Sequence, residues 1–175
     1  MTDTIAIIDQ IIEEHKVLLA QANQFEKITN DAGAMKALTR SKEIFMPGRI
    51  DQVQSLKKFE ELRNTIQEGL NAHFNREETY LLDAILENGD QDVITAFKNL
   101  FSEHTAFRAS LSELKAESDE LINGQISRAL WETKAYDMRA HVTEMNKNLE
   151  KHARNETKLL GDLRKELIKA KTGDN

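Results

Sequence analysis

The sequence contains no cysteine, which excludes disulfides, thiolate metal sites, iron–sulfur clusters and cysteine nucleophiles together. Any metal that the chain holds must therefore be bound by nitrogen and oxygen. The absence of cysteine also suits a reducing cytosol. Only one proline, Pro47, and seven glycines interrupt 175 residues that are rich in good helix formers. We therefore expect an all-α fold.

Long apolar runs are missing as well. No run approaches the roughly 18 residues that a membrane-spanning helix needs, and the N-terminal stretch MTDTIAIIDQ lacks the basic and small-residue parts of a signal peptide. We expect a cytoplasmic protein with no membrane partner. The 24 basic and 30 acidic residues are interspersed and give a net charge of −6, so no basic face for nucleic acid stands out. We expect no nucleic-acid partner, and the sequence does not point to any particular protein partner.

The length predicts a single domain over residues 1–175. Apolar residues at helical spacing divide it into four long helical segments, at about 4–30, 49–87, 91–121 and 126–169. An irregular connector at 31–48 separates the first two, Asp90 is a candidate N-cap for the third, and 170–175 reads as a disordered tail. Because the other turns are short, the sequence predicts an up-down-up-down antiparallel four-helix bundle.

Four of the five histidines lie on the apolar stripes of different segments: His15, His73, His104 and His152. At about 1.5 Å per residue they lie roughly 17, 21, 20 and 26 Å from one end of the bundle, so they can share one level. Two are followed four residues later by glutamate, in His73-x-x-x-Glu77 and His152-x-x-x-Glu156, which keeps each pair on one helix face. Four histidines and two glutamates are thus expected to converge from all four helices.

Imidazole nitrogen combined with carboxylate oxygen suits iron, manganese or zinc, and two shared glutamates would neutralise half the charge of two divalent ions. The two halves of the chain repeat the pattern, since Glu14-His15 precedes the first His/Glu pair and Glu103-His104 precedes the second. Each half would bind one metal through two histidines. The Glu-x-x-His signature of ferritin-like di-metal bundles is absent. The sequence therefore predicts a dinuclear site in the bundle core.

This pattern resembles the hemerythrin-like family of cation-binding domains, which are built from a repeated His, His, Glu motif. The resemblance covers the chain from His15 to Glu156. It implies that the four histidines are terminal ligands and that Glu77 and Glu156 bridge two irons, with manganese and zinc as alternatives. Oxygen-carrying hemerythrins have a further histidine where this chain has Arg108, whose guanidinium we expect to extend toward solvent. The chain looks more like the four-histidine, two-glutamate members, which are linked to iron or oxygen sensing, peroxide breakdown and nitric-oxide-related repair.

Three other residues stand near the predicted site, and a fifth histidine lies apart from it. Tyr80 follows Glu77 by three residues and would either donate a hydrogen bond to bound oxygen species or pack in the core. Glu14 and Glu103 would either accept from histidine N–H groups on adjacent helices or remain solvated charges. His141 lies about 16 Å along the helix from the site, so we expect a core histidine bonded to a neighbouring polar group.

Two classes of function fit this sequence. The first is a non-heme di-iron protein that binds or reacts with dioxygen, peroxide or nitric oxide, in sensing or in a stress response. Whether such a protein is an enzyme is left open by the ligands alone. The second is a helical module, stabilised by its metals, that reports iron availability to a protein partner.

Overall fold

The structure, a computed structural model, describes residues 4–31, 50–123 and 126–172, and the side chains of 50–58 and 128 fall outside this description. Within these ranges every regular element is helical: α1 Thr4–Asn30, α3 Ile50–Arg76, the π-helical turn η1 Glu77–Leu81, α4 Leu82–Asn88, α5 Gln91–Asn123 and α6 Arg128–Thr172. The segments α3, η1 and α4 follow one another without a break and form one long helix. The predicted all-α fold is confirmed.

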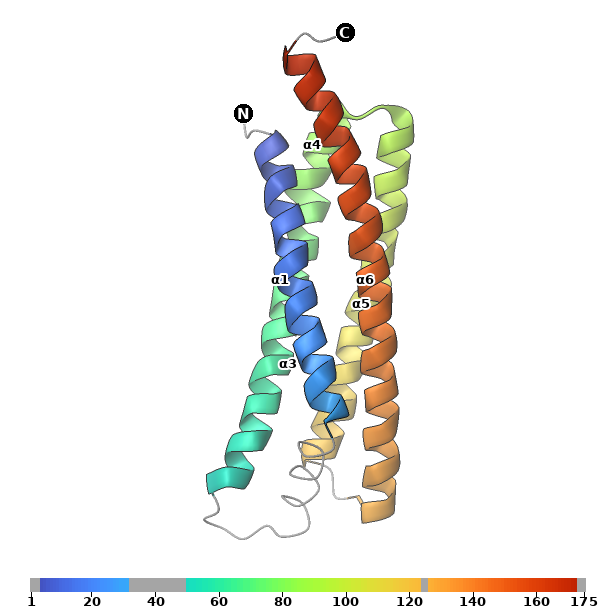
Figure 1. Cartoon of the computed structure of the whole chain (residues 1–175). Coiled ribbons are helices and arrows are strands. Elements are labelled where there is room, and N and C mark those ends of the chain that lie inside the picture. Colours follow the sequence, from blue (N-terminus) through green and yellow to red (C-terminus); the bar gives the residue numbers. More distant parts are fainter. Residues whose placement is uncertain (1–3, 32–49, 124–125, 173–175) are drawn as a thin grey trace.

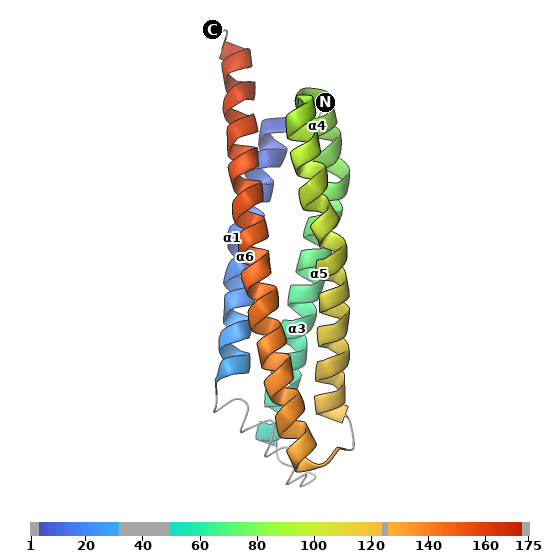
Figure 2. The ribbon, with the colours of Figure 1, turned by 90° about the vertical axis from the view of Figure 1, so that its right-hand side faces the viewer.

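The four long helices alternate in direction, and both chain termini lie at the same end of the bundle (Figure 1). Helix α1 contacts α3 and α6, and α5 contacts the same two helices, so the order around the bundle is α1, α3, α5, α6 (Figure 2). The predicted connector falls on residues that lie almost wholly outside the described ranges. The predicted disordered tail is wrong for residues 170–172, because α6 continues to Thr172.

The tight turn between α4 and α5 is set by two residues. The Asp90 carboxylate accepts a hydrogen bond from the Val93 backbone N–H at 2.8 Å, so Asp90 caps α5 as expected. Gly89 ends α4 by donating its N–H to the Ile85 carbonyl at 2.8 Å. A Cβ atom at position 89 would stand 2.8 Å from that same oxygen, which explains glycine there. This turn brings α5 back alongside α3.

Two hydrophobic clusters fill the bundle and leave a layer of histidine and glutamate between them. One cluster lies toward the termini: Ile8, Ile11, Leu81, Ile85, Phe97, Leu100, Leu160 and Leu163. The other fills the opposite half and includes Leu18, Phe25, Ile66, Leu70, Phe74, Phe107, Leu111, Met138 and Leu149. The polar layer is therefore closed off from water above and below.

Apolar spacing predicts a buried stripe on α5 of Val93, Phe97, Leu100, His104, Phe107, Leu111 and Leu114, and all of these except the half-buried Val93 are buried. On α1 the spacing predicts a stripe of Ile5, Ile8, Ile12, His15, Leu19 and Ala22, of which Ile8, His15 and Ala22 are buried. Ile11 and Leu18 are buried in place of Ile12 and Leu19, which lie at the edges of the clusters. Ile11 and Ile12 are adjacent, as are Leu18 and Leu19, so the apolar pattern alone does not decide which member of each pair is buried.

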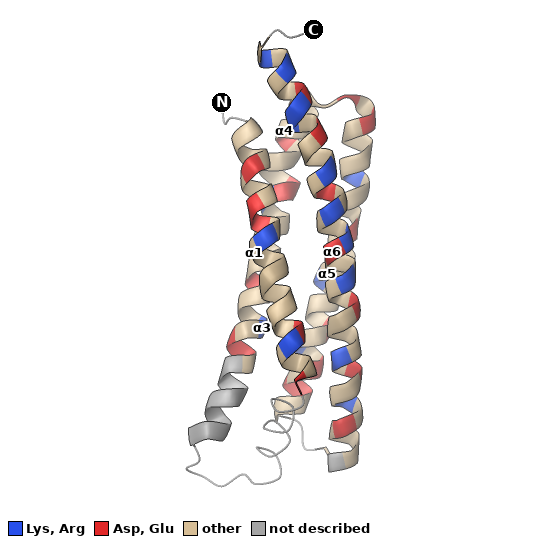
Figure 3. Cartoon of the chain, in the orientation of Figure 1, with Lys and Arg blue, Asp and Glu red and all other residues tan. Residues whose placement is uncertain are grey.

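Acidic and basic residues alternate along the described parts of the helices (Figure 3). An example is the ion pair between Arg164 of α6 and Asp9 of α1, with Nε and Oδ1 at 2.7 Å. No helix in the described ranges is long and apolar enough to cross a membrane.

Candidate metal centre

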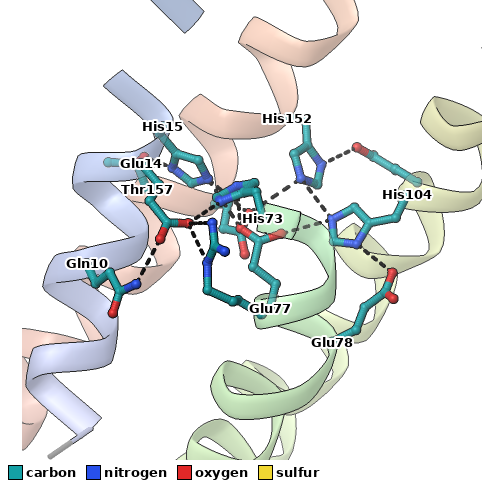
Figure 4. Close-up of polar contacts among 12 residues, drawn as sticks. Gln10, Glu14, His15, His73, Glu77, Glu78, His104, His152 and Thr157 are labelled. Carbon is teal, nitrogen blue, oxygen red and sulfur yellow. Dashed lines mark hydrogen bonds and ion pairs between the residues drawn. The ribbon is translucent and has the colours of Figure 1, made fainter. Parts of the chain in front are cut away.

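The six residues singled out in the sequence meet in the polar layer: His15, His73, Glu77, His104, His152 and Glu156. Figure 4 labels all of them except Glu156. All six side chains are buried. Their potential ligand atoms form two groups, in each of which the atoms lie within 4.8 Å of one another. The first group holds His15, His73 and both glutamates, and the second holds His104, His152 and Glu77. The structure thus pairs the histidines by chain half, as the internal repeat predicts.

Glu77 lies between the two pairs of histidines. Its Oε1 stands 2.7 Å from His73 Nε2 and 3.4 Å from His15 Nε2, whereas its Oε2 stands 3.3 Å from His104 Nε2. One oxygen therefore faces each pair. This is the placement that a carboxylate bridging two ions needs.

Glu156 approaches from the opposite side of the layer. Its Oε2 lies 3.4 Å from both His15 Nε2 and His152 Nε2, so it too reaches one histidine of each pair. Its Oε1 has no hydrogen-bond partner among the described residues. Both glutamates are completely buried, which is costly for a carboxylate unless a cation or donors compensate it.

The π-helical turn at Glu77–Leu81 begins at the first of these glutamates. The Leu82 N–H reaches back five residues to the Glu77 carbonyl, so one extra residue is inserted in the turn. The inserted residue turns Tyr80 further from the core, where 66% of its surface is exposed, while Leu81, four residues after Glu77, stays buried. The expectation that Tyr80 points at the metals or packs in the core is wrong for this reason.

In each histidine of the centre, the Nδ1 atom, which faces away from the centre, contacts a polar side chain. His73 donates to Glu14 at 2.8 Å, His104 to Glu78 at 2.9 Å and His152 to Glu103 at 2.9 Å. His15 Nδ1 lies 2.9 Å from the hydroxyl of Thr157. Glu14 and Glu103 therefore adopt the first of the two roles weighed from the sequence. Sequence reasoning missed Glu78 and Thr157, although each directly follows a glutamate of the centre.

These outer contacts fix the tautomers. A carboxylate can only accept, so the Nδ1 atoms of His73, His104 and His152 carry a hydrogen, and in the neutral ring Nε2 turns a lone pair toward the centre. His104 Nε2 and His152 Nε2 lie 3.2 Å apart and face each other. A cation placed among these atoms would be bound by the lone pairs of both neutral rings.

Unpartnered buried atoms gather at the same point. His15 Nε2 and all four oxygens of Glu77 and Glu156 have no hydrogen-bond partner among the described residues. Buried polar atoms in proteins rarely lack a hydrogen-bond partner. A metal ion can bind several acceptor atoms at once. Four nitrogens and four oxygens with no thiolate match iron, manganese or zinc. The residues present therefore fit a pair of metal ions.

The pKa shifts in the metal-free site show that the two buried glutamates favour positive charge beside them. Burial works against protonation of His15, but Glu156 and Glu77 outweigh it and raise the pKa of His15 to about 9. Burial likewise opposes ionisation of Glu156, but His15 and His152 hold its pKa well below the usual range. His104 has its pKa lowered by burial. A metal ion would take the place of the proton on His15.

Arg108 does not simply extend into solvent as expected. Its two terminal nitrogens contact the two Glu78 oxygens at 2.7 and 2.9 Å, and its guanidinium carbon lies 5.5 Å from the centre of the Phe74 ring. Phe74 in turn stacks on His104 with ring centres 4.2 Å apart. The hydrogen bond from Arg108 holds the pKa of Glu78 below its usual range. A neighbouring carboxylate therefore compensates this cation, which the expectation of a solvent-directed side chain did not foresee.

His141 lies apart from the centre, as expected. Its Nε2 accepts from the Ser110 hydroxyl at 2.7 Å, and its Nδ1 donates to Glu117 at 2.9 Å. Both of its nitrogens are thus satisfied by residues of α5.

Residues 6–163 match the protein family described as the hemerythrin HHE cation-binding domain. The chain belongs to this family. The match spans both halves of the repeat, so the predicted resemblance is confirmed. No curated protein and no solved structure gives a match to the chain. The buried histidine and glutamate groups give this hemerythrin HHE domain a metal-binding site of the kind that its family description names.

Proposed function

We propose that the domain holds two iron ions, that His15, His73, His104 and His152 are their terminal ligands, and that Glu77 and Glu156 bridge them. The observation that carries this proposal is the set of unpartnered acceptor atoms that converge between the two hydrophobic clusters. With both carboxylates shared, each ion would receive two nitrogens and two oxygens, which leaves coordination positions for a small molecule. Iron is favoured over manganese and zinc because of the family resemblance.

We further propose that a small oxidant, namely dioxygen, peroxide or nitric oxide, binds or reacts at this centre. Bound iron would supply electrons and open coordination positions to such a molecule. The chain's own residues keep bulk water away, because Phe74, Phe101 and Phe107 surround the His104 and His152 rings. A cavity of about 400 Å³ between α1 and α6 reaches His15 and gives small molecules a way toward the centre.

Anaerobic loading with ferrous iron followed by rapid mixing with dioxygen, hydrogen peroxide or nitric oxide tests this function. We expect a rapid change in the absorption spectrum with at least one of the three, and the same change in His141→Ala, which keeps all six proposed ligands. Iron-loaded protein that reacts with none of them would overturn the proposal. Purified protein that carries only zinc would argue against iron as its metal.

A second function is supported by the position of the site. The centre joins all four long helices between two cores, so metal binding would stabilise the whole bundle. A domain that folds firmly only when metal is present would report iron supply to a protein partner. A large metal-dependent gain in stability without any reaction with oxidants would favour this function over the first.

A further inference from the structure

The outer contacts of the four histidines form a closed ring around the bundle. In each contact the acceptor is the chain neighbour of a ligand on one helix, and the histidine lies on the next helix: Glu14 of α1 with His73 of α3, Glu78 of η1 with His104 of α5, Glu103 of α5 with His152 of α6, and Thr157 of α6 with His15 of α1. Figure 4 shows several of these pairs. Each helix therefore positions a metal ligand of its neighbour.

Comparison of the two halves of the internal repeat shows that one contact in the ring, that of Thr157, differs from the others. Glu14-His15 corresponds to Glu103-His104 in the second half, and both glutamates accept from a histidine. Glu77-Glu78 corresponds to Glu156-Thr157. Thr157 thus places a neutral hydroxyl where the other half of the molecule has a carboxylate.

Two arginines do not remove this asymmetry, because each half has one. Arg76 binds Glu14 with Nη2 and Oε2 at 2.9 Å, and Arg108 binds Glu78 with Nη1 and Oε1 at 2.7 Å. Each pair of histidines therefore contains one ring that donates to an arginine-bound carboxylate. Among the outer contacts, the remaining difference is that His152 donates to Glu103 whereas His15 contacts Thr157.

A carboxylate that accepts the Nδ1 hydrogen increases the basicity of the ligating nitrogen and holds the ring in place. A hydroxyl does both less strongly because it carries no charge. Thr157 and His15 also line the cavity of about 400 Å³ between α1 and α6, so this contact is open on its outer side. The ligand with the weakest outer contact is therefore also a ligand that a cavity reaches.

We propose that the two metal positions are unequal, with Thr157 acting as the positioning residue that makes the His15/His73 position the weaker and more exchangeable one. The His104/His152 position, supported by two carboxylates, is the tighter one. This inference rests on the proposed two-ion centre. It assigns exchange of metal, and access of small molecules from the α1/α6 cavity, to one particular ion.

Titration of the metal-stripped full-length chain with cobalt(II), against a competing chelator, measures the two binding steps separately. We expect two steps of different affinity in the unmodified chain. Thr157→Val keeps the shape but loses the hydroxyl, and it should weaken the second step by about 10-fold or more while the first is unchanged. Glu103→Gln should weaken the first step instead. Circular dichroism of each variant checks that the bundle has formed.

Two further variants separate a positioning role from a packing role. Thr157→Ser loses a methyl group but keeps the hydroxyl, so it should bind cobalt like the unmodified chain. Thr157→Glu supplies the missing carboxylate, for which the adjacent cavity offers room, and it should tighten the second step toward the first. Both results are cobalt binding constants, so they do not depend on whether the centre reacts with an oxidant.

The inference is overturned if the unmodified chain binds two cobalt ions with equal affinity, or if Thr157→Val weakens the tighter step. A loss in Thr157→Ser equal to that in Thr157→Val would also overturn it, because packing would then be the cause. If two unequal steps are found but the iron-loaded protein reacts with no oxidant, the proposed oxidant chemistry fails and this inference stands. If the chain binds fewer than two ions, the two-ion centre itself fails.

Discussion

At a pH above the raised pKa of His15, where its ring is neutral, replacing Glu77 by glutamine should make the metal-free protein more stable, and it should make the metal-loaded protein less stable. Both Glu77 oxygens are buried and unpartnered, and Oε1 faces the acceptor atom His73 Nε2 at 2.7 Å. Glutamine has the same shape but turns one acceptor into an NH2 donor, which can bond to a histidine lone pair. The same change removes a negative charge and a bridging oxygen from the metal site.

The expected magnitudes differ in sign between the two states. Satisfying one buried polar group contributes about 1–3 kcal/mol, and for a chain of this size each kcal/mol moves the melting temperature by about 2–4 °C. The metal-free variant should therefore melt about 2–12 °C above the unmodified chain. Two ions, each at a free concentration roughly 1,000 times its Kd, add about 8 kcal/mol to the unmodified chain. In the variant this gain should fall to less than about half.

Thermal unfolding followed by circular dichroism measures both quantities, with a chelator above the pKa of His15 and then with excess metal at neutral pH. Glu113→Gln makes the same chemical change on the exposed face of α5 and should alter neither melting temperature. If metal-free Glu77→Gln melts below the unmodified chain and keeps the full metal-dependent rise, the reasoning from unpartnered acceptors is refuted.

Three further predictions concern His141, which lies apart from the centre, and Tyr80 and Arg108, which lie closer to it. His141→Ala should leave the number of bound ions unchanged and cost about 1–2 kcal/mol through its lost hydrogen bonds, as metal analysis and denaturant unfolding would show. Tyr80→Phe should change neither metal content nor the rate of reaction with peroxide, because Tyr80 faces solvent; a slower reaction in stopped-flow spectra would contradict the outward orientation. Arg108→Met should release Glu78 and weaken the tighter cobalt step by about 10-fold, with Arg108→Lys intermediate; an unchanged binding constant would show that the ion pair does not support the site.

Much of this fold could be predicted from the sequence because helical periodicity is a local signal. The bounds of α1 and the stripe of α5 follow from apolar spacing, and Asp90 follows from capping chemistry. The meeting of the six site residues could be predicted too, because it depends only on helix length and direction. The rise per residue fixes the position of each residue along the bundle axis. Four histidines on the inward stripes of four antiparallel helices can therefore be placed at one level from sequence numbers alone.

The π-helical turn could not be predicted, and the error on Tyr80 follows from it. An inserted residue leaves no mark in the apolar spacing of the sequence. It turns Tyr80, three residues after Glu77, further away from the core. The ion pair of Arg108 with Glu78 was missed for a different reason, because it joins two helices and local spacing does not reveal contacts between helices.

The central claim is that Glu77 and Glu156 together hold two ions. Elemental analysis of iron-loaded protein, compared with the double variant Glu77→Ala/Glu156→Ala, tests it most directly. The unmodified chain should contain about two iron ions and the double variant almost none, because each carboxylate serves both ions. Retention of two ions per chain in a folded double variant would contradict the carboxylate-bridged centre.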